Sequence, residues 1–225
     1  MGTQNNNIIS RLVYENARAA VAAAFGGTPG FSLEAYKMTQ SYLRLEQTVT
    51  TTKAQYTFPI LVNQGNPTTT EWRLNLQDSF VVAHVGVFLA LPSSATDATY
   101  RLQTYPDPLV FTTGAAALGI VYAGNLNLSV NNNVLIPAWD IYRHYVVNQT
   151  QASVAAVAPP PNAQLNQNNG GEDSFYAMEP NIILVGSKNN VLTVTLPSAV
   201  ATVDANTRLV LLLRGILVQN STVVS

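Results

Sequence analysis

The 225-residue sequence contains no cysteine, which excludes disulfide frameworks and thiolate metal sites and leaves packing to stabilise the fold. Charged residues are also scarce, with 11 basic and 12 acidic residues and a formal net charge of -1. This near balance offers no broad cationic face and argues against nucleic acid as the main ligand. The most apolar stretch, residues 207–220, has a run from Leu209 to Val218 of about half the length of a membrane-spanning helix, with Arg214 inside it, so no membrane span is expected.

Apolar residues make up 47% of the chain, enough to build the core of one large domain or two small ones. In a free monomer about a quarter of all residues are usually charged, whereas in this chain the charged fraction is 10%. The chain is instead rich in Asn, Gln, Thr and Ser. Because charge depletion is typical of interface cores, much of the surface is predicted to be covered by other protein. The alternative is a monomeric β-domain with a polar, uncharged coat.

Residues 1–46 show helical patterns. In the first pattern, Asn7 is the predicted N-cap and Gly26 and Gly27 the predicted stop. One side of this helix collects Ile8, Ile9, Leu12, Val13, Ala19, Ala20, Ala23 and Ala24. A second helical pattern begins at Ser32 and carries Leu33, Tyr36, Tyr42 and Leu43. We therefore expect a helical N-terminal arm over residues 1–46. The chain start lacks the features of a secretory signal, which predicts cytoplasmic synthesis.

From about residue 48 onward the pattern becomes alternating, as β-strands require. Strands are predicted within residues 48–60, 71–76, 79–92, 99–105, 125–137, 180–186, 191–197 and 207–220. Residues 186–190 are predicted to form a hairpin turn, and residues 150–173 a Pro- and Asn-rich exposed loop. The predicted fold is mainly β: one antiparallel sandwich or barrel of about eight strands over residues 47–225.

The last predicted strand is apolar on both faces, so both faces should be covered. Leu209, Leu211 and Leu213 share the face toward the opposite sheet. Val210, Leu212, Arg214 and Ile216 share the other face, where we expect a helix or a neighbouring subunit. Together with Ile8, Ile9, Leu12 and Val13 of the arm, these four are the predicted subunit contacts. Arg214 is interpreted either as a subunit contact paired with a carboxylate or as a guanidinium whose stem lies along an apolar face.

Few residues suggest chemistry. His84 lies mid-strand and is interpreted as a core or interface residue. His144 follows Asp140 by four residues, and Trp139, Tyr142 and Tyr145 add possible stacking surfaces for a ligand, although an aromatic packing anchor is the favoured interpretation. The acidic residues Glu172, Asp173 and Glu179 suggest either a calcium site or a solvated loop end. No catalytic motif is present, and we expect no enzyme activity, metal or cofactor.

The helical arm, the antiparallel strand pattern, the scarcity of charge, the amide and threonine content and the proline-rich loop resemble the jelly-roll coat proteins of icosahedral viruses and phages. The resemblance implies a capsid or capsid-associated subunit, made in the host cytoplasm, that packs with copies of itself as trimers, pentamers or a larger shell, with other virion proteins as further partners. The length favours a single barrel. Only Arg11 and Arg18 could serve as a basic arm. The alternative is a carbohydrate-binding or attachment domain, a fibre or adhesin, that uses Trp139, Tyr142 and Tyr145.

Overall fold

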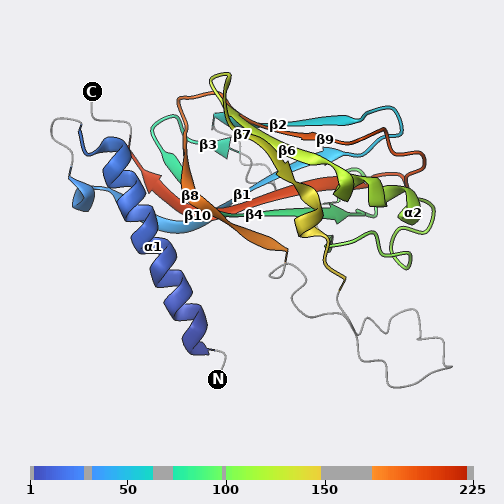
Figure 1. The fold of residues 1–225 in the computed structure, drawn as a ribbon, viewed down its shortest axis with the longest axis horizontal. Helices are drawn as coiled ribbons and strands as arrows, with labels where there is room; N and C mark the ends of the chain where they lie inside the picture. Colours follow the sequence, from blue (N-terminus) through green and yellow to red (C-terminus); the bar gives the residue numbers. More distant parts are fainter. Residues whose placement is uncertain (1–2, 28–31, 63–72, 98–99, 148–173, 222–225) are drawn as a thin grey trace.

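The computed structural model describes residues 3–27, 32–62, 73–97, 100–147 and 174–221. Over these residues the chain is mainly β, with two sheets packed face to face and a long helix on the outer side of one of them (Figure 1). The strands are β1 Lys37–Thr48, β2 Gln55–Val62, β3 Arg73–Leu74, β4 Ser79–Ala90, β5 Leu102–Gln103, β6 Asn125–Val130, β7 Asn133–Asp140, β8 Phe175–Val185, β9 Asn190–Thr195 and β10 Arg208–Gln219. The helices are α1 Thr3–Phe25 and α2 Ala115–Leu118, with 3-10 turns η1 Leu33–Ala35, η2 Gly119–Ala123 and η3 Ile141–His144.

The first sheet has the order β1-β10-β4, and β5 and β8 both pair with the remaining edge of β4. The second sheet has the order β3-β2-β9-β6-β7. The described pairings are antiparallel except for the two-residue contact between β2 and β3. The expectation of a mainly β, antiparallel fold in two layers is therefore confirmed.

The main core lies between the two sheets. Strand β10 contributes Leu209, Leu211 and Leu213 to it, as the alternating pattern predicted, and each is at most 3% exposed. Strand β4 is buried on both faces, because one face lies in the core between the sheets and the other is covered by α1 and by outer side chains around Val81, Phe88 and Ala90. Burial of this kind stabilises by about 25 cal/mol per Å² of apolar surface and dominates in a chain without disulfides.

Strand β1 corrects the helical prediction for residues 32–46. Only Leu33–Ala35 are helical there, and Lys37–Thr48 pair with β10 along their whole length. Leu43 and Leu45 point into the core, whereas Arg44 and Glu46 alternate with them on the outer face. The predicted boundary between arm and β-domain at residue 46 therefore falls inside a strand.

Helix α1 begins at Thr3, four residues before the predicted cap Asn7, and ends at Phe25 before the two glycines, as predicted. Its buried side is formed by Ala17 and Val21, which pack on Val81, Ile216 and Val218 of the first sheet. Tyr14, Ala20 and Phe25 of the helix are partly buried beside them. Ala19, Ala23 and Ala24 are exposed, so the predicted apolar side was wrong for these three. The N-terminal half of α1 extends beyond the sheets (Figure 1).

Two turns also differ from expectation. Asn131 and Asn132 have φ values of 49° and 65°, the backbone of a two-residue hairpin turn, and they divide the single strand predicted over residues 125–137 into β6 and β7. Residues 186–190 do not make a hairpin, because β8 and β9 belong to different sheets. The Asn190 side chain holds this connection by donating to the carbonyls of Val185 and Lys188 at 2.9 and 3.0 Å. The predicted loop at 150–173 lies outside the described residues.

Candidate assembly surface

Two of the predicted subunit contacts on β10 are covered by the chain itself. Ile216 is buried under α1, beside Ala17 and Val21. Val210 is buried in a second outer cluster with Phe88 and Ala90. At these two positions the layer expected beside β10 is therefore supplied by the chain itself, by α1 over Ile216 and by neighbouring side chains around Val210. Neither residue is exposed for contact with a second copy.

The other two predicted subunit contacts on β10, Leu212 and Arg214, are less buried than Val210 and Ile216. Leu212 is partly buried against the same outer cluster as Val210. The guanidinium carbon of Arg214 lies 3.9 Å from the ring centroid of Phe175, a cation–π contact across the outer face. This arrangement agrees with the interpretation of Arg214 as a guanidinium lying over apolar surface.

The predicted contacts on the arm lie on the half of α1 that extends beyond the sheets. Leu12 is 59% exposed and Val13 is partly exposed. Ile8 and Ile9 lie within the helix, but their side chains are outside the described residues. The exposed Leu12 keeps this end of the helix available as a contact surface.

A charged cluster on the outer face of the first sheet was missed by sequence analysis. Glu46 accepts hydrogen bonds from Arg44 Nε at 2.6 Å, from Arg208 Nη1 at 2.7 Å and from the Tyr100 hydroxyl. Burial alone would raise the pKa of Glu46, but the bonds from Tyr100 and Arg208 and the charge of Arg44 lower it on balance. The ion pair of Glu46 with Arg208 links β1 to β10, and the hydrogen bond from Tyr100 links β1 to the residues before β5. Together these contacts stabilise the outer side of the first sheet.

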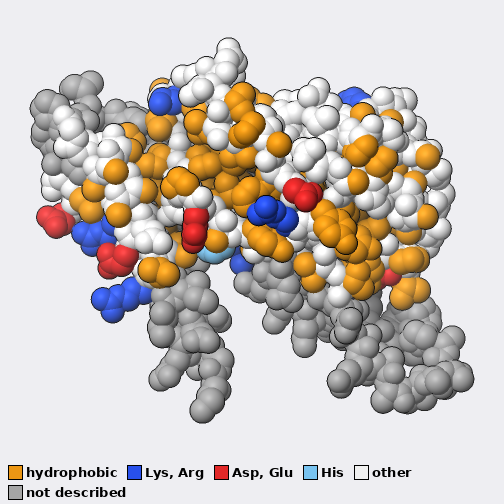
Figure 2. Space-filling model, viewed as in Figure 1, with side chains coloured by type: hydrophobic (Ala, Val, Ile, Leu, Met, Phe, Trp, Pro, Cys, Tyr) orange, Lys and Arg blue, Asp and Glu red, His pale blue; other side chains and the backbone are white. Residues whose placement is uncertain are grey.

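Five of the ten large apolar side chains that are exposed in the described part of the chain lie within residues 133–147, which we call the β7–η3 edge. Strand β7 ends the second sheet in the described order, and no residue from Asn133 to Trp139 is ionisable. Its exposed apolar side chains are Val134, Leu135, Tyr142, Tyr145 and Val147. Figure 2 shows hydrophobic side chains gathered over this part of the face with few charged side chains among them. Exposed apolar surface of this kind marks interaction sites.

The aromatic residues predicted as stacking surfaces lie together on this edge, but in different environments. Tyr142, 66% exposed, stacks parallel to Tyr145 with 6.0 Å between ring centroids. Trp139 is half-buried, and the guanidinium of Arg143 lies 5.0 Å from its ring centroid. The edge therefore presents a tyrosine pair to solvent, whereas the indole is largely engaged by the chain.

His144 is buried behind this surface. Trp139 Nε1 donates to His144 Nε2 at 2.9 Å, and His144 Nδ1 lies 2.7 Å from the Ser174 carbonyl. Because Nε2 accepts, Nδ1 must carry the proton and donate to that carbonyl. The Ser174 hydroxyl in turn donates to the His144 carbonyl at 3.2 Å. The Asp140 carboxylate accepts from the backbone N–H of Tyr142, so it caps η3. The arrangement agrees with the structural interpretation of His144.

Burial lowers the pKa of His144, and the nearby charge of Arg143 adds to that effect. The carbonyl of Ser174 and the charge of Asp140 act in the opposite direction but do not outweigh it. The neutral ring is also the form that the hydrogen bonds require, because a protonated Nε2 would face the N–H of Trp139. His144 is thus held neutral in the folded protein.

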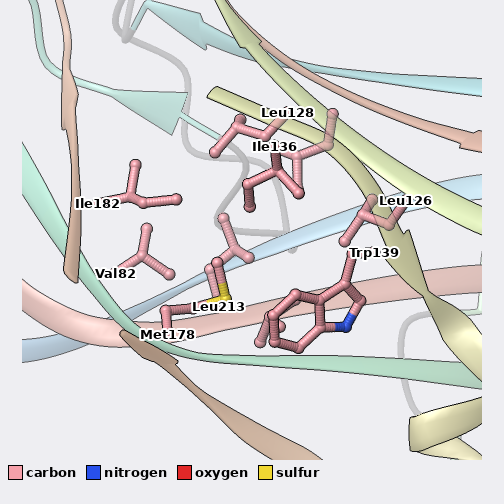
Figure 3. A pocket seen from close by; sticks show the side chains of 10 residues that line it. Val82, Leu126, Leu128, Ile136, Trp139, Met178, Ile182 and Leu213 are labelled. Atoms are coloured by element: carbon pink, nitrogen blue, oxygen red, sulfur yellow. The ribbon is translucent and has the colours of Figure 1, made fainter. Parts of the chain in front are cut away.

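A cavity opens between the two sheets beside the β7–η3 edge (Figure 3). The space enclosed in it is only about 10 Å³, room for about one water-sized group. The first sheet supplies Val82, Val85, Met178, Ile182 and Leu213, and the second supplies Leu126, Leu128, Ile136, Trp139 and Leu192. All ten are apolar apart from the indole nitrogen, which is bonded to His144. The side chains around this small space therefore offer apolar contacts only.

Other predicted sites find less support. Glu172 and Asp173 lie outside the described residues, and Glu179 is an exposed residue of β8. The described residues contain no group of three His, Asp or Glu side chains placed to hold a metal ion. His84 lies in β4, opposite Arg214 of β10 and Ala177 of β8. No helix in the described part of the chain has the length and hydropathy needed to cross a bilayer.

Comparison of the chain with models of known families, with curated proteins and with solved structures gives no match.

Proposed function

We propose that this protein is a virion structural protein, a capsid or capsid-associated subunit with a jelly-roll body, which assembles with copies of itself. The observation that carries the proposal is the order in which the strands pair. Its remaining support comes from the composition of the surface and from the exposed β7–η3 edge. The proposal assigns no catalytic step and no cofactor.

The eight longer strands pair as a nested series when they are taken in chain order. The first pairs with the eighth (β1 with β10), the second with the seventh (β2 with β9), the third with the sixth (β4 with β8) and the fourth with the fifth (β6 with β7). Contacts of β10 with β4 and of β9 with β6 join these pairs into two sheets. A long hairpin rolled into two sheets pairs in this way, and viral capsid and lectin domains use such jelly rolls.

The surface favours the capsid over the other uses of this fold. With 10% charged residues, copies of this chain repel one another only weakly through their charges, so they can associate closely. The β7–η3 edge adds exposed Val134, Leu135 and Tyr142, and aromatic and apolar side chains are typical of interface centres. Pro137 within β7 lacks an N–H, and the pairing of β7 with β6 is irregular, so we infer contact through side chains and not through an added strand.

The carbohydrate-binding alternative has one observation in its favour, the solvent-facing Tyr142 stacked on Tyr145. Trp139, which sequence analysis placed in the same platform, instead has its nitrogen bonded to His144 and its ring beside Arg143. Specific glycan binding that is lost on Tyr142→Ala would support this alternative.

Light scattering on the full chain after size exclusion, followed by electron microscopy of the eluted material, tests the proposal. We expect trimers, pentamers or larger closed particles. A monomer that persists at high micromolar concentration would contradict it.

Substitution of Leu135 tests which surface is used. Leu135→Glu places a carboxylate among the exposed apolar side chains of β7 and should weaken self-association about tenfold or more, because an unpaired charge is costly to bury in an interface. The matched control is Leu76→Glu, which changes another half-exposed leucine, between β3 and β4. Equal assembly of Leu135→Glu and the unmodified chain would exclude this edge as the contact.

A further inference from the structure

We propose that strand β1 pairs edge to edge and antiparallel with the β1 strand of a second copy, so that the first sheets of two molecules join into one. Pairing of this kind goes beyond the proposed function, because it needs neither the β7–η3 edge nor a closed shell. Its support comes from the open edge of β1, from the protection of the other strand edges and from the sequence of β1 itself.

The open edge of β1 is long and regular. The strand ends the first sheet in the described order, and its twelve residues pair with β10 without a break in register. It contains neither proline nor glycine. Within the described part of the chain, no backbone hydrogen bond reaches β1 from its other side. A long edge with unpaired N–H and C=O groups is a template for another strand.

The register shows which backbone groups point to this open edge. Just beyond β1, the N–H of Val49 donates to the carbonyl of Thr207 at 2.8 Å, and these two residues continue the register of β1 with β10. Hydrogen-bonded and non-bonded pairs alternate along an antiparallel ladder, so the odd-numbered residues of β1 bond β10. The even-numbered residues direct their N–H and C=O groups outward: Met38, Gln40, Tyr42, Arg44, Glu46 and Thr48.

The other strand edges of the described structure are short or interrupted. Strands β3 and β5 have two residues each. Strand β7 contains Pro137 and pairs irregularly with β6. Strand β8 contains Pro180 and shifts its register with β4 between Val82 and His84. Short length, proline and bulges keep an edge from pairing with other chains. Among these edges, only β1 lacks all three protections.

A second copy fits the open edge because the sequence of β1 complements itself. With a twofold axis at Leu43, all six outward residues find a partner. The pairs are Tyr42 with the partner's Arg44, Gln40 with the partner's Glu46, and Met38 with the partner's Thr48. No like charges are opposed, and the exposed Tyr42 can pack on an arginine. An axis at Arg44 would instead oppose two arginines, which disfavours that register.

Amide hydrogen exchange resolved to single residues, on dilute and on concentrated full-length chain, tests the pairing. The outward amides of β1 should exchange quickly in dilute protein and about tenfold or more slowly in concentrated protein, whereas the odd-numbered amides are protected in both by β10. Fast exchange of the outward amides in concentrated protein would overturn the proposal. Protection of these amides in the monomer would also overturn it, because the chain would then cover its own edge.

Replacement of Gln40 provides matched variants. Gln40→Pro removes an outward N–H and none that bonds β10, so it should return the other outward amides to fast exchange in concentrated protein. Gln40→Ala retains the N–H and should keep them protected. Circular dichroism establishes that both variants are folded. If Gln40→Pro does not fold, Tyr42→Lys replaces it with Tyr42→Glu as control, because Lys repels the partner's Arg44 and Glu attracts it. Unchanged protection in the folded Gln40→Pro or Tyr42→Lys chain would reject the pairing.

Light scattering on the same samples separates this pairing from the proposed function. Large particles whose outward β1 amides exchange quickly would reject the pairing and leave the capsid proposal standing. A dimer with protected outward amides that forms no larger particle would support the pairing and contradict the capsid proposal.

Discussion

His144 joins a neighbour in the sequence, Trp139, to Ser174, which lies 30 residues after the histidine. Through one imidazole, Trp139 of β7 and Ser174, next to β8, are tied together behind the β7–η3 edge. The same ring therefore supports both the proposed contact surface and one wall of the cavity. Its protonation state should matter for each of them.

We expect the protein to lose stability as the pH falls below about 6.5. The folded state lowers the pKa of His144, so the unfolded chain binds a proton at a higher pH than the folded one. The stability that the neutral His144 contributes is complete above the pKa of histidine in the unfolded chain. It is lost as the pH falls below that pKa, by at most about 1.4 kcal/mol per pH unit. Urea unfolding at a series of pH values measures it.

Replacement of each histidine separates this effect from general acid sensitivity. His144→Gln should reduce the pH dependence between about pH 5 and 6.5, although it lowers stability throughout, because Gln cannot reproduce both hydrogen bonds. His84→Gln should retain the pH dependence due to His144. A His144→Gln protein with the full pH dependence would refute the assignment.

Single residues of the site were only partly predictable from sequence. Trp139, Tyr142 and Tyr145 were grouped correctly as neighbours on one segment, because they lie within seven residues. The partners that decide their roles come from elsewhere: Ser174 fixes His144, and Met178 and Ile182 face Trp139 across the cavity. Such contacts depend on strand pairing, which no local pattern encodes.

At the scale of elements, helix α1 behaves as an attachment to the β-body. Its buried contacts are made to the outer side of the first sheet, while no side chain described for α1 belongs to the main core between the sheets. We therefore expect the sheets to remain folded when α1 is released, since local opening requires only the loss of this small outer cluster.

Ala17→Glu tests the attachment. Ala17 of α1 is fully buried against the first sheet, so a carboxylate there should detach the helix and speed tryptic cleavage after Arg18 at least tenfold, while the circular dichroism of the sheets is retained. Ala23→Glu, at an exposed position of the same helix away from the Arg18–Ala19 bond, is the control and should be cleaved at the original rate. Cooperative unfolding of the whole chain by Ala17→Glu would show that α1 belongs to the core.

Strand β1 shows why one element was misassigned. Its residues Lys37, Met38, Leu43, Leu45 and Glu46 all favour helices, and the spacing of Leu33, Tyr36 and Leu43 fits a helical side. The alternation of Leu43 and Leu45 with Arg44 and Glu46 was also present, and pairing with the long apolar β10 decided in favour of the strand. For β4 and β10, length and β-branched content left no such conflict, and both were predicted correctly.

At the scale of the whole molecule, low charge sets how assembly should respond to salt. If the copies meet through apolar and amide side chains, screening removes little attraction, even at about 1 M salt where the Debye length is about 3 Å. Light scattering in low and high sodium chloride should give the same or larger particles at high salt. Dissociation by salt would instead indicate contacts made by ion pairs, with Arg44, Arg208 and Arg214 the first to examine.

The pairing of β1 with β10 also bears on how the chain acquires its shape during synthesis. The strand made last among those described lies between β1 and β4, two strands made much earlier. Until β10 has left the ribosome, β1 and β4 each lack the hydrogen-bonded neighbour that β10 later supplies. Completion of the first sheet must therefore wait for translation of β10, and until then the open edges of β1 and β4 can pair with other chains.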